Sequence, residues 1–177
     1  MHLECRGIPL SEEQKIFLGL GSNKGKRYQN LKNGIHLLNS HPHIWVIEKS
    51  HVYQSPAMYQ ADQDDFYNMV VEIDTNLIPI DLLTEIKKIE LKAGRIPENK
   101  KNMPRILDID ILAIGNMQIQ SASLTIPHPG ISERKFVLKP WIDISPAFIL
   151  PNFSVTVSDL LVNTDDSSDV RMVLILD

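Results

Sequence analysis

The stretch PRILDIDIL, residues 104–112, decides how this chain is interpreted, because two acids separated by one residue stand inside an apolar, β-branched run. Such a run predicts a β-strand. Side chains alternate across a strand, so Asp108 and Asp110 project from one face while their apolar neighbours project from the other. Two neighbouring carboxylates repel each other. A divalent cation such as Mg²⁺ relieves that repulsion while keeping ligand positions for phosphate oxygens.

A plainer interpretation is an amphipathic strand whose acids face water, because antiparallel sheets often leave one face solvated. Two observations favour a site instead. The face that carries the acids continues into Ile106 and Leu112, which is unlike a simple wet face. Arg105, just before the strand, adds a cation of the kind that binds phosphate.

The composition is typical of one globular domain, with 43% hydrophobic and 23% charged residues. The length of 177 residues is sufficient for a single sizeable hydrophobic core. The net charge of −4 gives no general attraction to nucleic acid or membrane, so phosphate binding needs a local cluster of Lys and Arg. The lone Cys5 excludes a disulfide framework and a multi-cysteine zinc site. We find no apolar run near the ~18 residues of a membrane span, and no secretory core in residues 1–15. We therefore expect a cytoplasmic protein that binds neither nucleic acid nor membrane.

Periodicity and breaker residues predict the elements around the acid strand. The expected order is a strand over 16–20 ending at Gly21, a helix over 27–39 with Ser22 or Asn23 as candidate caps, strands over 44–53 and 67–74, a helix from Pro79 to Gly94, a basic loop over 94–104, and the acid strand ending at Gly115. This βαββαβ order predicts an α+β, ferredoxin-like sandwich, a mainly antiparallel sheet covered by helices.

The rest of the chain is expected to decorate this sandwich. We predict an extended segment over 124–129, a short helix over 132–138, another over 157–162, a polar loop over 164–169 and a closing strand over 173–176. An exposed edge at that last strand could also pair with another chain. The predicted division is an N-terminal extension over 1–15, a main domain over 16–163, and a C-terminal loop and strand over 164–177.

The glycine-rich segment 19–26 follows a strand and opens a helix, as a phosphate loop does, but its spacing is wrong. Five residues separate Gly19 and Gly25, and Lys24 stands where a dinucleotide-binding loop needs its third glycine. We interpret the segment as a strand-to-helix turn in which the glycines permit tight backbone geometry. The His-Pro-His at 41–43 has no acid or cysteine cluster near it in sequence and is interpreted as a loop.

Two further residues have a structural and a functional interpretation. His128 lies in a proline-flanked segment soon after the acid strand and is followed by the charged residues 133–135. It is either a loop histidine or a group that holds phosphate beside a metal. Asn68 is either a strand-edge residue or a hydrogen-bonding reader of a polar ring.

Together these residues resemble the 6-hydroxymethyl-7,8-dihydropterin pyrophosphokinase family of folate biosynthesis. The resemblance runs from about residue 16 to 151. It includes LGSN at 20–23, SP at 55–56, FYN at 66–68, the segment 90–95, PRxxDxDIL at 104–112 and IPHPxxxxRxFVLxP at 126–140. It implies that the main domain transfers the β,γ-diphosphoryl group of ATP to the pterin hydroxymethyl group, leaving AMP.

The resemblance also implies roles for residues that spacing alone does not assign. Asp108 and Asp110 would hold two Mg²⁺ ions, Asp110 also being a plausible acceptor of the hydroxymethyl proton, and with Arg95 and Arg105 they would form the catalytic set. The residues that face ATP would be Glu90, Arg95, Arg105, Ile111, Thr125, His128 and Arg134. The pterin pocket would consist of Ser55, Ala57, Met58, Phe66, Asn68 and Phe136, with Asn68 reading the amide edge and the phenylalanines stacking on the ring.

The chain departs from the family pattern mainly in the basic loop, at Pro97, Asn102 and Met103, and also at Phe66. We expect intact chemistry with altered nucleotide affinity or rate, because such loops often limit turnover. ATP and the pterin are the expected partners, in a monomer or weak homodimer. Two rival interpretations are a two-metal nucleotidyl or phosphodiester enzyme, which leaves the aromatic pocket without a use, and a sensor domain, which leaves the acid pair without one.

Overall fold

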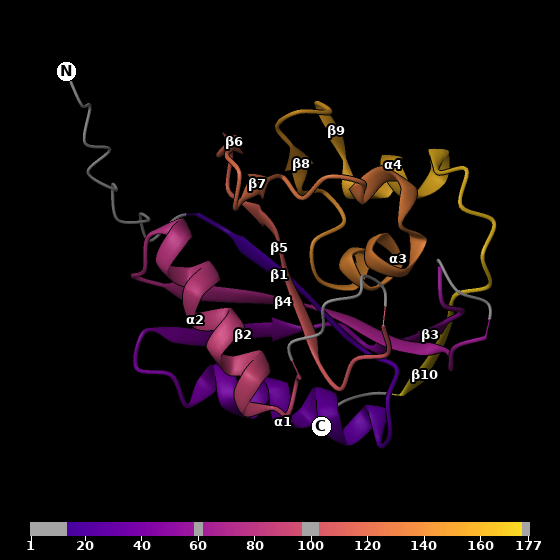
Figure 1. Ribbon diagram of the computed structural model, residues 1–177. Coiled ribbons are helices and arrows are strands. Elements are labelled where there is room, and N and C mark those ends of the chain that lie inside the picture. The colour runs from indigo at the N-terminus through magenta and orange to yellow at the C-terminus, as the bar shows by residue number, and fades with distance from the viewer. Residues whose placement is uncertain (1–13, 59–61, 97–102, 175–177) are drawn as a thin grey trace.

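The computed structural model describes residues 14–58, 62–96 and 103–174. Its centre is a six-stranded antiparallel sheet with strand order β10-β3-β4-β1-β5, in which β2 also pairs with β4 (Figure 1). The strands are β1 Ile16–Ser22, β2 Ile44–Lys49, β3 Val52–Ser55, β4 Phe66–Thr75, β5 Asp108–Ile114 and β10 Arg171–Leu174.

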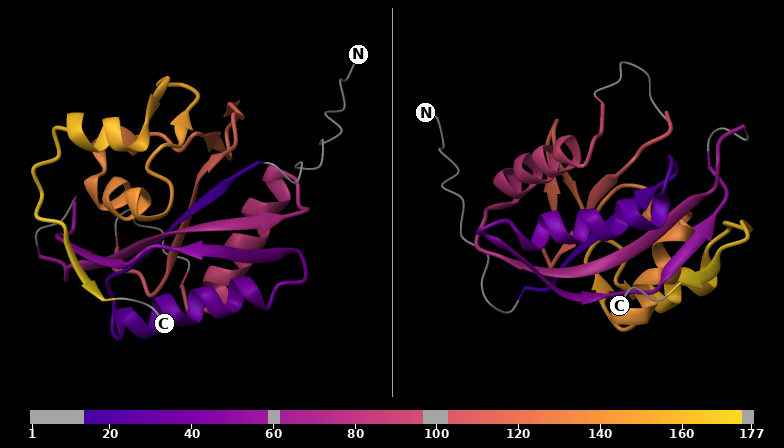
Figure 2. Two further views of the ribbon diagram at one scale, coloured as in Figure 1. Left: turned by 180° about the vertical axis from the view of Figure 1, so that it is seen from behind. Right: turned by 90° about the horizontal axis from the view of Figure 1, so that it is seen from below.

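Helices lie on both faces of this sheet (Figure 2). α1 (Arg27–Asn39) and α2 (Pro79–Lys92) cover one face, and α3 (Lys135–Ile144) and α4 (Val157–Asn163) lie on the other side. The short elements are the hairpin of β6 (Ile119–Gln120) and β7 (Thr125–Ile126), the hairpin of β8 (Ile149–Leu150) and β9 (Val155–Thr156), and the 3₁₀ helix η1 (Ile131–Glu133).

Each face of the sheet has its own core, as strand alternation requires. Leu18, Val71 and Ile109 belong to the cluster of buried residues that lies under α1 and α2. On the other face, Phe17 of β1 packs against Trp141 of α3 and against Phe148, with ring centroids 5.0 Å and 4.9 Å apart. These aromatic contacts hold α3 against the sheet.

The structure confirms the ferredoxin-like order and the helix over 27–39, and it shows where the predicted boundaries are wrong. The single strand expected over 44–53 is two strands, because the chain leaves the ladder at Ser50. The Ser50 hydroxyl accepts a hydrogen bond from the Val70 amide at 2.9 Å and donates one to the His51 carbonyl at 2.8 Å. A side chain thus takes the place of a ladder partner.

The helix expected over 132–138 is also wrong in its bounds. The chain forms η1 first and then α3, which continues to Ile144 through Pro140. The expected closing strand is β10, and it pairs with β3 of the same chain. The predicted N-terminal extension lies almost entirely outside the described residues. In the described residues, no helix is both long and apolar enough to cross a membrane.

Candidate functional site

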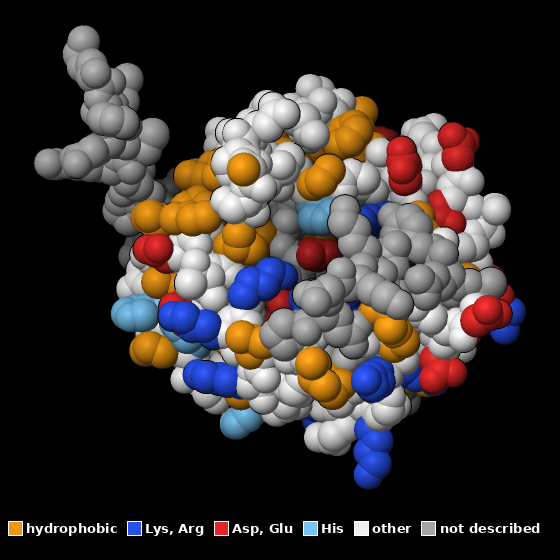
Figure 3. All heavy atoms as spheres, in the orientation of Figure 1, with side chains coloured by type: hydrophobic (Ala, Val, Ile, Leu, Met, Phe, Trp, Pro, Cys, Tyr) orange, Lys and Arg blue, Asp and Glu red, His pale blue; other side chains and the backbone are white. Residues whose placement is uncertain are grey.

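A cavity of about 290 Å³ lies between the sheet and the start of α3. Figure 3 shows this face of the molecule, where acidic, basic and histidine side chains gather around a hollow. The walls combine the ends of β1, β4 and β5, the segment after β3, and the segments around His128 and Arg134. Residues as far apart in the sequence as Gly19 and Val137 therefore meet at one place.

The floor of the cavity is formed by two glycines of β1. Gly19 lies opposite Asp110 in the sheet and Gly21 lies opposite Asp108. A Cβ atom at Gly21 would be 3.1 Å from Asn68 Oδ1, and one at Gly19 would be 3.3 Å from the Leu112 side chain. Both lie in β1, as the expected strand ending at Gly21 implies, so the turn interpretation of segment 19–26 is wrong for its first residues. Their missing side chains leave the space that the cavity occupies.

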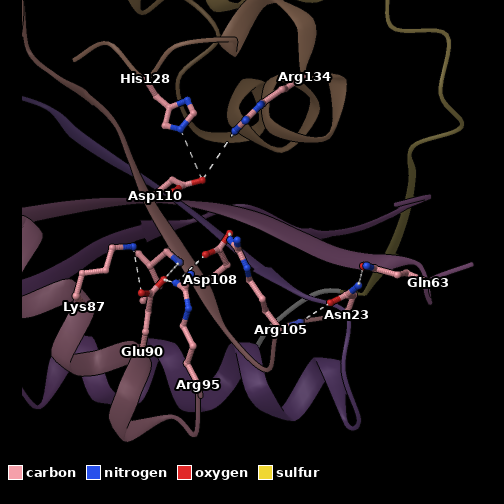
Figure 4. A network of polar contacts seen from close by, with 11 residues as sticks. Asn23, Gln63, Lys87, Glu90, Arg95, Arg105, Asp108, Asp110, His128 and Arg134 are labelled. Atoms are coloured by element: carbon pink, nitrogen blue, oxygen red, sulfur yellow. Dashed lines mark hydrogen bonds and ion pairs between the residues drawn. The ribbon is translucent and has the colours of Figure 1, made fainter. Parts of the chain in front are cut away.

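Asp108 is held by two arginines (Figure 4). Its Oδ1 atom accepts a hydrogen bond from Arg95 Nη1 at 3.0 Å, and its Oδ2 atom accepts one from Arg105 Nη1 at 2.5 Å. Arg95 approaches from the end of α2, whereas Arg105 precedes β5. Both carboxylate oxygens of Asp108 are thus paired with cations.

Glu90, near the end of α2, lies under the acid strand with its side chain 1% exposed. Its Oε1 atom accepts a hydrogen bond from the Ile109 amide at 2.7 Å and lies 2.5 Å from Arg95 Nη1. Its Oε2 atom lies 3.1 Å from Lys87 Nζ. Burial raises the pKa of Glu90, against the lowering effects of Lys87, the Ile109 hydrogen bond and Arg95. Glu90 thus braces the backbone between the two aspartates.

Asp110 faces the opposite rim of the cavity. Its Oδ2 atom lies 3.9 Å from His128 Nε2 and 3.9 Å from Arg134 Nη1. The His128 amide donates to the Leu112 carbonyl at 2.8 Å, which fixes this segment beside β5. Burial, with Arg134 beside it, lowers the pKa of His128, although Asp110 acts in the other direction. Asp110 is therefore the more loosely paired acid of the two.

Asn23 connects three segments of the site, a role that the sequence analysis did not predict. It is 1% exposed, and its Oδ1 atom accepts a hydrogen bond from the Arg105 amide at 2.7 Å. Its Nδ2 atom donates to Gln63 Oε1 at 2.9 Å, so one side chain connects the end of β1, the segment before β5 and the segment before β4 (Figure 4). The sequence signal was the polar residue after the apolar strand, which we interpreted as a helix cap. The residue preceding α1 is Lys26 instead.

The apolar end of the cavity contains the residues expected to bind a ring. Phe66 and Phe136 both line it, from β4 and α3. Asn68 Nδ2 donates to Ser55 Oγ at 2.9 Å, a buried bond between β4 and β3. Because that bond orients the amide, Asn68 can present a fixed polar edge to a ligand.

Eleven of the predicted site residues line this cavity: Ser55, Ala57, Met58, Phe66, Asn68, Arg105, Asp108, Asp110, His128, Arg134 and Phe136. Arg95 lines a smaller neighbouring hollow of about 60 Å³ instead. Ile111 is buried in the core, Thr125 lies in β7, and Glu90 lies beneath the aspartates. The roles of all these residues stay predictions. The lining residues that sequence reasoning did not assign to the site are Gly19, Leu20, Gly21, Pro56, Gln63, Met69, Leu112 and Val137, besides Met103, a predicted departure from the family pattern.

The two carboxylates fit a hard divalent cation, which prefers oxygen ligands and readily keeps water and phosphate oxygens in its remaining positions. Among the described residues, no group of three or more His, Cys, Asp and Glu side chains is placed to hold a cation. A cation here would therefore depend on oxygens from a bound substrate or water. That requirement is typical of magnesium sites that act on nucleotide phosphates.

The topology and the cavity define a ferredoxin-like α+β domain with a candidate ligand site on one sheet face, where paired acids meet basic residues. Comparison with known proteins identifies its family. The chain belongs to the 7,8-dihydro-6-hydroxymethylpterin-pyrophosphokinase family, whose model matches residues 17–146.

Individual relatives agree with that assignment. The chain is 37% identical over 158 residues to the 2-amino-4-hydroxy-6-hydroxymethyldihydropteridine pyrophosphokinase of Methylorubrum extorquens, covering 89% of this chain and 98% of that protein. It is 37% identical over 156 residues to the folic acid synthesis protein FOL1 of Dictyostelium discoideum, covering 88% of this chain and 23% of that protein. The chain thus spans less than a quarter of the length of this second relative.

A solved structure supports the fold. Plasmodium falciparum HPPK-DHPS, wild type with pterin and p-hydroxybenzoate, matches with a TM-score of 0.65 at 17% identity, covering 86% of this chain and 42% of that chain.

Proposed function

We propose that this chain transfers the β,γ-diphosphoryl group of ATP to 6-hydroxymethyl-7,8-dihydropterin, giving AMP and the pterin diphosphate in folate biosynthesis. The observation that carries the proposal is that paired acids, basic groups and an aromatic end with an oriented amide meet in one cavity. The family to which the chain belongs and the pyrophosphokinase relative support it.

The residues of the chain divide the work between the two ends of the cavity. Asn68, oriented by Ser55, hydrogen-bonds the amide edge of the pterin, and Phe66 and Phe136 enclose its ring. This places the hydroxymethyl group toward the acids. Such positioning converts a two-molecule reaction into one between fixed neighbours.

At the polar end, the basic residues hold the triphosphate. His128 and Arg134, on the rim beside Asp110, and the pair Arg95 and Arg105 bind phosphate oxygens and stabilise the charge that develops as the group moves. The hydroxymethyl oxygen forms a bond to the β-phosphorus, and the bond from that phosphorus to the oxygen bridging the α-phosphorus breaks. Asp110, the loosely paired acid, is placed to accept the hydroxyl proton.

Asp108 and Asp110 would hold the Mg²⁺ ions, whose chemistry is to neutralise phosphate charge and orient the oxygens. In the structure Arg95 and Arg105 occupy both oxygens of Asp108. Phosphate oxygens are strong acceptors for guanidinium groups, so an arriving triphosphate draws the arginines away from Asp108. We therefore expect cation and nucleotide to bind together rather than separately.

The remaining expectations are a cytoplasmic location, a monomer or weak homodimer, and the division at residues 16 and 163. The loop departures Pro97 and Asn102 lie outside the described residues. Met103 lines the cavity, which supports an effect of this position on nucleotide affinity.

The test is to incubate the chain with ATP and Mg²⁺, with and without the pterin, and to separate AMP from ADP. Pterin-dependent AMP that disappears in Asp110→Ala supports diphosphoryl transfer. Release of AMP without pterin would indicate phosphodiester chemistry instead. An absence of turnover with tight pterin binding would indicate a sensor.

A further inference from the structure

The chain after α4 runs along one side of the molecule to the edge of the sheet (Figure 1). Residues 164–174, here called the C-terminal strap, run from the end of α4 to β10 at the sheet edge (Figure 1, yellow). The strap lies beyond residues 17–146, the part of the chain that the family model matches. It contacts α3, which carries the predicted site residue Phe136 and directly follows Arg134.

The strap supplies a cap that α3 lacks locally. Within the described chain, the residue before α3, Arg134, makes no side-chain capping bond, and the first turn of α3 contains no acid. Asp166 takes this role from 31 positions away, because its Oδ2 atom accepts a hydrogen bond from the Lys135 amide at 2.9 Å. An acidic cap satisfies a free amide and favours the positive end of the helix dipole.

Asp166 is itself held in place by the strap. Its Oδ1 atom accepts a hydrogen bond from the Ser168 amide at 2.9 Å, and its own amide donates to Thr164 Oγ1 at 3.3 Å. The Thr164 hydroxyl donates to the Ser132 carbonyl at 2.7 Å. The carboxylate thus meets α3 from a fixed loop rather than from a free side chain.

The same strap connects α3 to β3, whose last residue, Ser55, also lines the cavity. Lys139 Nζ of α3 donates to the Val170 carbonyl at 2.6 Å, and Lys135 Nζ donates to the Ser168 carbonyl at 3.0 Å. The strap then pairs with β3, with Met172 opposite Tyr53. One segment therefore contacts two of the elements that line the cavity.

We propose that Asp166 is a positioning residue for substrate binding: by capping α3 from the strap, it sets Arg134 and Phe136, which flank Lys135, in the cavity. This inference rests on the proposed function, because those two side chains are the predicted phosphate and pterin contacts. Asp166 touches neither substrate and acts through the backbone of Lys135.

The experiment compares Asp166→Ala with two matched variants. Asp165→Asn removes the same charge from the exposed neighbouring position. Thr156→Ala removes a different helix cap, because Thr156 Oγ1 accepts the Asp159 amide at the start of α4. It is therefore expected to lower the stability by a similar amount while leaving the hydrogen bond between Asp166 and the Lys135 amide intact.

We expect Asp166→Ala to weaken pterin binding on the order of tenfold, measured by titration with 6-hydroxymethyl-7,8-dihydropterin, which is the size of effect expected when a capping bond is lost. The KM for the pterin rises accordingly and kcat falls less. Hydrogen exchange of the first-turn amides of α3 becomes faster. Asp165→Asn and Thr156→Ala leave the pterin affinity within about twofold of the starting protein.

An unchanged pterin affinity in a folded Asp166→Ala, or an equal loss in Thr156→Ala, would overturn the inference. If Asp166→Ala does not fold, the pterin affinity of Asp166→Asn tests the inference instead. This variant keeps an oxygen acceptor for the Lys135 amide, so its pterin affinity should fall by only about twofold to threefold. A starting protein that binds no pterin would overturn the proposed function itself, and the inference with it. Binding without AMP formation would overturn only the proposed reaction.

Discussion

The contacts of the buried Glu90 carboxylate predict how its substitution changes the free energy of unfolding. The side chain of Glu90 is 1% exposed, and it makes one backbone hydrogen bond and two ion pairs. A buried charge is costly unless its partners offset the loss of water. Glu90→Gln removes the charge but keeps an oxygen acceptor, whereas Glu90→Ala removes the side chain beyond Cβ. The two variants therefore separate the contribution of the charge from that of the hydrogen bond.

We expect Glu90→Gln to change the free energy of unfolding by less than about 1 kcal/mol at neutral pH. The amide oxygen still accepts the Ile109 hydrogen bond. Neither cation is left buried and unpaired, since Arg95 keeps Asp108 and the Lys87 side chain, 46% exposed, can turn into water. Removing one partner of a buried pair is severe only when it strands the other.

Glu90→Ala is expected to cost about 2–4 kcal/mol. The orphaned Ile109 amide, in a residue with no exposed surface, contributes about 1–3 kcal/mol of that loss. The space left by the missing side chain contributes a further ~1 kcal/mol, partly offset by the higher helix propensity of alanine. The assay is urea unfolding with a chelator present, followed by fluorescence of the buried Trp141.

The pH dependence of the free energy of unfolding tests the effect of the Glu90 charge directly. Burial raises the pKa of folded Glu90 above its unfolded value of about 4.3. The favourable contribution of the protonated form is therefore present below pH ~4 and is lost as the pH rises through the folded pKa. Glu90→Gln should thus gain stability relative to the starting protein between pH 4.5 and 7.5. A relative loss over that range would mean that the ion pairs with Lys87 and Arg95 outweigh burial, and would refute the reasoning.

Three other changes probe the cavity. Asp110→Asn should lower kcat by about 10³-fold with little loss of stability, as measured by AMP formation and urea unfolding; near-normal turnover would exclude Asp110 from the reaction. Gly21→Ala places a Cβ atom 3.1 Å from Asn68 Oδ1, so it should weaken pterin binding about tenfold and lower the free energy of unfolding by ~1–2 kcal/mol. Unchanged pterin binding in a titration would argue against a pterin ring beside Asn68. Asn23→Ala leaves the Arg105 amide without its acceptor, which should cost about 2 kcal/mol and raise the KM for ATP; a changed stability with an unchanged KM would limit Asn23 to a structural role.

The sequence predicted the parts of this fold that local patterns control. α1 begins and ends where the periodicity and the stop after Asn39 indicate, and the acids of β5 share a face because strand alternation is a local property. The break at Ser50 was missed because it depends on a hydrogen bond to Val70 of another strand. Patterns within ten residues carry no signal of such a partner.

The role of the two cavity glycines also depends on contacts between distant parts of the sequence. Gly19 and Gly21 were placed at the end of the first strand, and their lack of a side chain was explained by a tight turn. In the structure it leaves room beside Asn68 and Leu112. That use depends on which strands lie beside β1. Only the assembled sheet shows that the empty positions face the acids rather than the core.

The ion pairs of Asp108 with two arginines could not be predicted from the spacing of the two acids alone. Its spacing from Asp110 suggests two equivalent carboxylates, but the fold brings Arg95 and Arg105 onto one of them and leaves the other with contacts of 3.9 Å. This asymmetry lowers the repulsion between the acids before any cation arrives, because one acid is already neutralised. Under the proposed function it would also separate their tasks: Asp108 would exchange its arginines for a cation when phosphate competes for them, and Asp110 would stay accessible to the attacking hydroxyl. The two acids are thus alike in sequence and distinct in chemistry because α2 ends beside β5.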